Sequence, residues 1–174
     1  MMTRKNNIAF TGMMGCGKTT AAKELSKLLT DFICIDIDEE IEKNTGKKIT
    51  EIFRYYGEQH FRMIENETIK KIFSGQKLIV SLGGGAFENQ RNRDIIEKSA
   101  YTVYLKASPE EIFNRIKNEL HRPLLKDNVS VEKISEILEK RGINYEKADL
   151  TVITDGKTPE ETVKEILEVF NDLS

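Results

Sequence analysis

The chain has 174 residues, a length that suits one domain with its own hydrophobic core. Its composition of 39% hydrophobic and 32% charged residues is that of a globular protein and excludes a disordered tail. Acidic and basic residues are interspersed and leave a formal charge of −2, so no basic surface for nucleic acid or an anionic membrane is indicated. The sequence has no apolar stretch of membrane-spanning length and no signal-peptide core, and we expect a cytoplasmic protein.

Five short runs rich in β-branched and aromatic residues alternate with amphipathic segments. Their apolarity is nearly continuous, which is typical of parallel strands covered on both faces. Ser108 and Thr158, each followed by proline, are typical N-caps of helices. The alternation predicts a three-layer α/β/α domain with a parallel sheet. The predicted strands are 7–11, 32–36, 78–82, 101–105 and 150–154.

Three further features of the chain accompany this alternation of strands and helices. The helical segment 19–29 has an apolar face, made of Ala22, Leu25, Leu28 and Leu29. The segment 119–130, "ELHRPLLKDNVS", lacks periodicity, and a loop of that length in a compact domain indicates a functional role. The two cysteines, Cys16 and Cys34, are interpreted as reduced thiols rather than a disulfide or metal site.

The stretch "GMMGCGKT" at 12–19 fits the pattern G-x-x-x-x-G-K-[ST] between a predicted strand and a predicted helix. Its glycines allow backbone N–H groups to surround phosphate oxygens, and the helix N-terminus adds its positive end. Lys18 supplies a charge for the β- and γ-phosphates, and Thr19 a hydroxyl for Mg²⁺. An ordinary glycine-rich turn is the alternative, but the complete pattern in this context favours nucleotide binding.

Polar or glycine-rich stretches follow two further predicted strands, where ligands bind in open parallel sheets. Asp36 and Asp38 lie two residues apart and share one side if the backbone is extended. They could serve a magnesium-nucleotide and an acceptor hydroxyl, although Asp38 could be only a helix N-cap. The triplet 83–85 places three glycines in a row, which indicates that another group comes close to the backbone there and argues against a flexible turn.

The stretch "GEQHFRMIE" at 57–65 contains an arginine and a glutamate three residues apart. On residue types alone, Arg62 and Glu65 are a solvated ion pair on a helix face. Phe61 and the earlier Phe53 are interpreted as core residues, and His60 as a surface or half-buried side chain rather than a ligand or base.

Together these stretches resemble the shikimate kinase family over almost the whole chain. The resemblance rests on the phosphate loop 12–19, D-x-D at 36–38, G-E-x-x-F-R-x-x-E at 57–65 and "SLGGG" at 81–85. It continues in "RPLL" at 122–125 and in R-x-x-x-Y within 139–148. Their order and spacing are specific to this family.

The resemblance implies ATP-dependent phosphorylation of the shikimate 3-hydroxyl in aromatic amino-acid biosynthesis, with Mg²⁺, by a cytoplasmic monomer of five-stranded kinase fold. It implies a single domain, 1–174, with a lid at about 119–130. The implied catalytic residues are Lys18, Asp38 and Arg122. The implied ATP-binding residues are Gly15, Cys16, Gly17, Lys18, Thr19, Thr20, Arg115, Arg122 and Lys157. The implied shikimate ligands are Asp38, Arg62, Gly84, Gly85 and Arg141, and the implied Mg²⁺ residues are Thr19 and, through water, Asp36.

The chain departs from the family pattern at two positions. Lys157 stands where many members carry arginine, which removes a planar stacking group from the adenine site. His121 precedes Arg122 in place of a more apolar residue. Two other functions are weighed against the main one: a kinase for gluconate or a nucleoside monophosphate, and a nucleotide sensor without catalysis.

Overall fold

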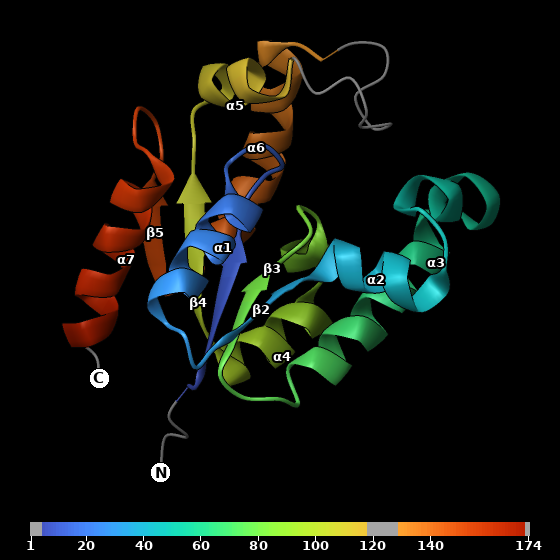
Figure 1. Cartoon of the computed structure of the whole chain (residues 1–174). Helices are drawn as coiled ribbons and strands as arrows, with labels where there is room; N and C mark the ends of the chain where they lie inside the picture. Colours follow the sequence, from blue (N-terminus) through green and yellow to red (C-terminus); the bar gives the residue numbers. More distant parts are fainter. Residues whose placement is uncertain (1–4, 118–128, 173–174) are drawn as a thin grey trace.

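A computed structural model describes residues 5–117 and 129–172 of the chain. Five parallel strands form one sheet in the order β2-β3-β1-β4-β5 (Figure 1). All five predicted strands and the predicted fold class are confirmed. The strands are β1 (Asn7–Thr11), β2 (Ile33–Asp36), β3 (Leu78–Ser81), β4 (Ala100–Lys106) and β5 (Leu150–Ile153).

Burial of the strands follows their place in the sheet. The central strands β1 and β3 are buried along their whole length, as their continuous apolarity predicts. The outer strands differ, because each has a neighbour on one side only. Ile33 in β2 is 63% exposed and Ile153 in β5 is 57% exposed, so the expectation of two covered faces is wrong for the outer strands.

Seven α-helices and one 3₁₀ helix, η1, connect and cover the strands within the described residues. Ser108 and Thr158 accept hydrogen bonds at their helix starts, which confirms both predicted N-caps. The prediction that Leu28 belongs to the buried face of α1 is wrong, because Leu28 is the last residue of that helix and is 59% exposed. The helices are α1 (Lys18–Leu28), α2 (Ile37–Thr45), α3 (Ile49–Ile72), η1 (Ala86–Glu88), α4 (Gln90–Ser99), α5 (Pro109–Ile116), α6 (Val131–Tyr145) and α7 (Pro159–Asp172).

The order of the strands creates a crevice at the carboxyl ends of β1 and β3. From β1 the chain crosses within the sheet toward the edge strand β2, whereas from β3 it crosses in the opposite direction to β4. Right-handed crossovers therefore place α1 and α4 on opposite faces, and the two loops diverge from neighbouring strands. Such a switch point is where open parallel sheets bind ligands. Both glycine-rich stretches, 12–17 and 83–85, lie there.

A kink divides the long helix α3. Gly57 adopts φ 82° and ψ 170°, a conformation that interrupts the helix and that only glycine adopts without strain. The part after Gly57 packs against α4 and η1 and carries Arg62 and Glu65. This packing brings a segment that is distant in sequence to the end of β3.

Candidate active site

The loop 12–17 has the backbone that phosphate binding requires. Gly12 has φ 136° and Gly15 has φ 79°, both in the left-handed region. A Cβ atom on Gly12 would lie 2.7 Å from the carbonyl oxygen of Leu105, and one on Gly15 would lie 2.6 Å from Cγ2 of Ile116. Neither position has room for a side chain, so the loop is packed tightly against β4 and α5.

The ammonium group of Lys18 is held at this loop. Its Nζ donates to the carbonyl oxygens of Gly12 at 2.8 Å and Met13 at 2.9 Å, and the residue is 8% exposed. Gly17 forms the N-cap of α1, so the positive end of that helix faces the same loop. The loop therefore combines a fixed cation with a helix N-terminus, which is the arrangement that binds polyphosphates.

Oxygen atoms from three elements meet at the start of α1. The Thr19 hydroxyl donates to Oδ2 of Asp36 at 2.7 Å and lies 3.2 Å from the Ser81 hydroxyl. Hydroxyl and carboxylate oxygens are the ligand types that Mg²⁺ prefers, directly or through water. No cluster of three or more His, Cys, Asp or Glu side chains that could hold a metal occurs among the described residues. The residues fit a magnesium ion that also takes oxygens from a nucleotide.

Asp36 and Asp38 have different environments. Strand β2 ends at Asp36, whose Oδ1 accepts from the backbone N–H groups of Asp38 at 3.0 Å and Glu39 at 3.3 Å. Asp36 is therefore the N-cap of α2, so the alternative that Asp38 is only the helix cap is wrong, and the segment 36–38 is not extended because the helix begins at Ile37. Asp38 lies in the first turn of the helix with a half-buried side chain. Its carboxylate faces the turn after β3, because a Cβ atom on Gly83 would lie 3.0 Å from Asp38 Oδ1.

Arg62 and Glu65 form an ion pair of 2.9 Å, but Glu65 is only 1% exposed. The interpretation as a solvated surface pair is therefore wrong for the glutamate. Burial raises the pKa of Glu65, the Arg62 charge opposes that rise, and the nearby Asp38 carboxylate adds to it. Oε1 of Glu65 is buried without a hydrogen-bond partner among the described residues, while Oε2 accepts from Arg62. The pair thus fixes the guanidinium beside the turn 83–85.

The turn 83–85 is contacted by side chains from α3 and α6. A Cβ atom on Gly85 would lie 2.5 Å from Nη2 of Arg62, so the guanidinium occupies the space beside this glycine. Nη1 of Arg141 in α6 donates to the carbonyl oxygen of Gly84 at 3.2 Å. The triplet therefore permits close contacts, as predicted, and in this structure the groups that approach it are the side chains of the site itself.

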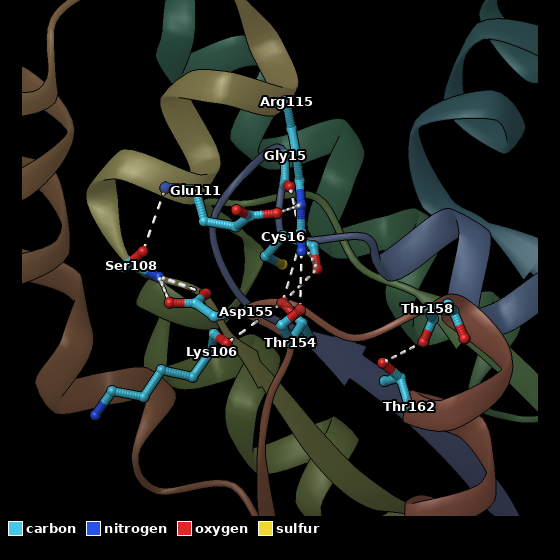
Figure 2. A network of polar contacts seen from close by, with 10 residues as sticks. All are labelled: Gly15, Cys16, Lys106, Ser108, Glu111, Arg115, Thr154, Asp155, Thr158 and Thr162. Carbon is cyan, nitrogen blue, oxygen red and sulfur yellow. Dashed lines mark hydrogen bonds and ion pairs between the residues drawn. The ribbon is translucent and has the colours of Figure 1, made fainter.

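Arg115 ties α5 to the outer side of the phosphate loop (Figure 2). Its Nη1 donates to the carbonyl oxygens of Gly15 at 3.4 Å and Cys16 at 3.3 Å, and to the Thr154 hydroxyl at 3.1 Å. Its Nε donates to Glu111 at 2.8 Å. The guanidinium is thus oriented by contacts on several sides and links the loop to the end of β5.

A cavity of about 240 Å³ lies beside Arg115. Lys157 also lines it, although its ammonium group is paired with Glu165 of α7. The cavity is continuous with the phosphate loop, as a nucleotide base site has to be. Its lining residues are Cys16, Gly17, Thr20, Ala21, Leu105, Glu111, Arg115, Thr154, Lys157, Pro159 and Thr162.

Comparison with known proteins identifies this arrangement. The family model described as shikimate kinase matches residues 14–171. The chain belongs to the shikimate kinase family. It is 42% identical to a shikimate kinase of Thermodesulfovibrio yellowstonii over 97% of this chain and 96% of that protein. It is 41% identical to one of Persephonella marina, over 92% and 96% of the two chains. The solved shikimate kinase from Acinetobacter baumannii, in complex with shikimate, superposes with a TM-score of 0.92 at 31% identity, over 98% and 96% of the chains.

Within the described residues, the side chains and loops that the resemblance assigns to ATP and to shikimate lie at the carboxyl ends of the strands. Arg122 and most of the segment 119–130 lie outside the described residues. Phe61 is buried and stacks on Phe53 with centroids 4.6 Å apart, and His60 is exposed, as expected. Cys16 and Cys34 are free thiols, as expected.

Sequence reasoning included three residues of this region in its motifs but assigned them no role in the site: Glu65 as a support of Arg62, Ser81 beside Thr19, and Tyr145. Ser81 is the last residue of β3, just before the glycine triplet, and its place at the strand end was a usable signal. Tyr145 is separated from Arg141 by one helical turn, and that spacing was the signal for a shared face.

Proposed function

We propose that the residues at the carboxyl ends of β1, β2 and β3 carry out the reaction of the shikimate kinase family in the following division of roles. The chain is a phosphotransferase that uses ATP with Mg²⁺ to phosphorylate the 3-hydroxyl of shikimate, in the pathway to chorismate and the aromatic amino acids. The observation that carries the assignment of roles is the juxtaposition of the phosphate loop with Asp38, Arg62 and Arg141 around one turn, 83–85.

On the nucleotide side, the N–H groups of the loop and the Lys18 ammonium bind the phosphates of ATP. Lys18 now bonds to two loop carbonyls, so it can turn to a phosphate by a small side-chain movement. Arg115 and Lys157 line the cavity that takes the adenine, with Thr20 at its edge. The remaining loop residues of the ATP site are Gly15, Cys16 and Gly17.

Thr19 and Asp36 would hold the Mg²⁺ ion, Thr19 directly and Asp36 through water. When bound, the ion neutralises phosphate charge during transfer. Asp36 has a second task as N-cap of α2, so its position is fixed by two backbone N–H groups. This N-cap position keeps Oδ2 of the Asp36 carboxylate beside the Thr19 hydroxyl.

On the acceptor side, Arg62 and Arg141 bind the shikimate carboxylate, since guanidinium groups form paired hydrogen bonds with carboxylates. Asp38 accepts from the acceptor hydroxyl, and Gly84 and Gly85 give backbone contacts. Phosphoryl transfer depends chiefly on such positioning and on neutralisation of charge. In this scheme the turn 83–85 separates the two arginines from the phosphate loop and aligns the hydroxyl with the γ-phosphate.

Four further assignments rest on the sequence and composition. Arg122 contributes positive charge at the phosphates, within a lid at 119–130. The chain forms a single domain, 1–174, and acts as a monomer without nucleic-acid or membrane partners. Free thiols at Cys16 and Cys34 support a cytoplasmic location. No helix in the described parts of the chain is both long and apolar enough to cross a membrane.

The test is an ADP-release assay with purified enzyme, ATP and Mg²⁺, in which shikimate, gluconate and AMP are compared as acceptors. We expect turnover with shikimate and only background rates with the other two. Turnover with gluconate or AMP would instead support another small kinase. ATP binding without ADP release for any acceptor would support a nucleotide sensor.

A further inference from the structure

Two hydrogen-bond donors from α6 converge on one backbone oxygen in the turn 83–85. The carbonyl oxygen of Gly84 accepts from Nη1 of Arg141 at 3.2 Å and from the hydroxyl of Tyr145. Arg141 and Tyr145 are four residues apart, so they lie on the same face of the helix. The two side chains therefore share one acceptor, and the contact of either affects the environment of the other.

Tyr145 differs from Arg141 in its burial. It is 0% exposed, and its ring packs on that of Tyr104 with centroids 5.2 Å apart. Burial raises the pKa of Tyr145 above the ordinary value of 10.0, so its hydroxyl keeps its proton and remains a donor. A side chain without exposed surface cannot bind the acceptor itself. Its hydroxyl can act only through the peptide group that it holds.

That peptide group joins Gly84 to Gly85. The described part of the chain has no cis peptide bond, and in a trans peptide the C=O and N–H groups point in opposite directions. Fixing the Gly84 oxygen toward α6 therefore directs the Gly85 N–H away from α6. The guanidinium of Arg62 lies against Gly85 on the side where a Cβ atom would be. The peptide is thus held between the two arginines assigned to shikimate.

The same peptide lies against the phosphate loop. A Cβ atom on Gly84 would lie 3.4 Å from the backbone nitrogen of Met14 and 3.7 Å from the carbonyl oxygen of Gly12. A rotation of this peptide would therefore disturb the turn 83–85 and its packing on the phosphate loop. A second, permanent donor on the Gly84 oxygen prevents that rotation.

We propose that Tyr145 is a positioning residue for the acceptor, which holds the Gly84–Gly85 peptide in place when Arg141 turns from the Gly84 oxygen to the shikimate carboxylate. The inference rests on the proposed function, because it uses the assignment of Arg141 to that carboxylate. In free enzyme the Gly84 oxygen has two donors. In the shikimate complex Tyr145 is the donor that remains, and an unpaired buried carbonyl is costly.

The test uses Tyr145→Phe, which removes only the hydroxyl, with Tyr104→Phe as the matched control. Tyr104 is 3% exposed in the same aromatic pair, whereas the side-chain donors to the Gly84 oxygen within the described residues are Arg141 and Tyr145. Calorimetric titration gives the Kd of shikimate and of ATP, and thermal unfolding gives the midpoint for each variant. We expect Tyr145→Phe to weaken shikimate binding by about three- to tenfold, the effect of one net hydrogen bond. ATP binding should stay within about twofold, as should both ligands in Tyr104→Phe.

A shikimate analogue without the carboxylate separates positioning from general loosening. With this analogue Arg141 stays on the Gly84 oxygen. The Tyr145→Phe variant should therefore bind the analogue with the same Kd as the wild type. An unchanged shikimate Kd, or an equal loss for shikimate, analogue and ATP, would overturn the inference. Failure of the proposed function is seen separately, because wild-type enzyme would then release no ADP in response to shikimate.

Discussion

The guanidinium of Arg62 lies against the backbone of Gly85 so closely that a Cβ atom there would come within 2.5 Å of Nη2 and 2.9 Å of Cζ. The arginine cannot move aside without cost, because Nη1 is bonded to the buried Glu65 at 2.9 Å. Gly85 is thus required by a contact between side chain and backbone, since its own φ of −104° is open to other residues.

Gly85→Ala should therefore displace Arg62 and weaken shikimate binding. We expect the KM for shikimate to rise about tenfold or more, as for loss of a charge-assisted hydrogen bond, with a smaller change in the KM for ATP. Steady-state kinetics with each substrate varied in turn measures both. Gly142→Ala in α6 is the control, because nothing lies within 4 Å of its Cβ position and alanine favours helix. A variant with wild-type shikimate KM would show that Arg62 does not need its observed position.

Lys18→Ala should nearly abolish turnover while the protein remains folded. Lys18 is the only lysine or arginine in the loop 12–19, and phosphoryl transfer depends on neutralisation of the phosphates. The midpoint of unfolding should fall only slightly, because two loop carbonyls lose a donor that water can replace in part. Lys23→Ala, in an exposed pair with Glu39 at 3.8 Å, is the control and should keep normal kinetics. Near-normal activity of Lys18→Ala would contradict the assignment of the ATP site.

The elements and the phosphate loop could be predicted because their signals are local. Strand runs, N-caps and the spacing Gly12 to Thr19 each lie within a few consecutive residues. The burial of Glu65 could not, because it depends on the packing of α3 after the kink at Gly57 against the turn that follows β3. The D-x-D segment was placed correctly at a strand end, but where the strand stops decides which aspartate caps the helix. The strand stops at Asp36, so Asp36 rather than Asp38 caps the helix, and such helix boundaries are the least determined part of a sequence pattern.

Asp38→Asn and Asp36→Asn should give different losses. Asparagine at 38 keeps the shape but cannot take the hydroxyl proton, so we expect kcat to fall by about 10²-fold or more while ATP binding and stability persist. Asparagine at 36 still caps α2 but weakens the oxygen set beside Thr19. That variant should need more Mg²⁺ for half-maximal activity. Rate measurements over a series of Mg²⁺ concentrations separate the two. A wild-type kcat in Asp38→Asn would leave Asp38 without a role in proton transfer.

Glu65 should make the stability of the protein depend on pH. Its pKa in the folded state is raised above the ordinary value of 4.5 by burial, so its contribution to folding is complete below that value. The contribution is lost as the pH rises through the folded pKa. Glu65→Gln does not titrate at this position, so its unfolding midpoint should rise relative to that of the wild type as the pH rises from about 4.5 through the folded-state pKa of Glu65.

Thermal unfolding across that pH range measures the effect, with Glu67→Gln as the control. Glu67 is on the same helix but 72% exposed in its pair with Lys70, so its variant should follow the wild type at every pH. Glu65→Gln should also bind shikimate more weakly, because Arg62 loses its charged support. A constant difference between Glu65→Gln and wild type over the whole range would contradict the raised pKa.

The clamp formed by Arg62 and Arg141 is tested by Arg→Lys at each position. If the two residues were only exposed side chains on helix surfaces, each change would have almost no effect on kinetics or stability, because exposed ion pairs contribute about 0–1 kcal/mol to stability. As carboxylate ligands they lose a planar, two-pronged donor and keep only a point charge. The KM for shikimate should then rise markedly in both variants, with a much smaller change for ATP.

Arg54→Lys, an exposed arginine in the first part of α3, is the matched control and should leave both KM values unchanged. A shikimate analogue without its carboxylate should bind poorly to the wild type, and should lose little more in either clamp variant, because the group that the arginines recognise is already absent. The clamp is contradicted if both lysine variants keep the wild-type KM for shikimate. It is equally contradicted if the carboxylate-free analogue is phosphorylated as efficiently as shikimate, since binding would then not depend on the group that the two guanidinium groups face.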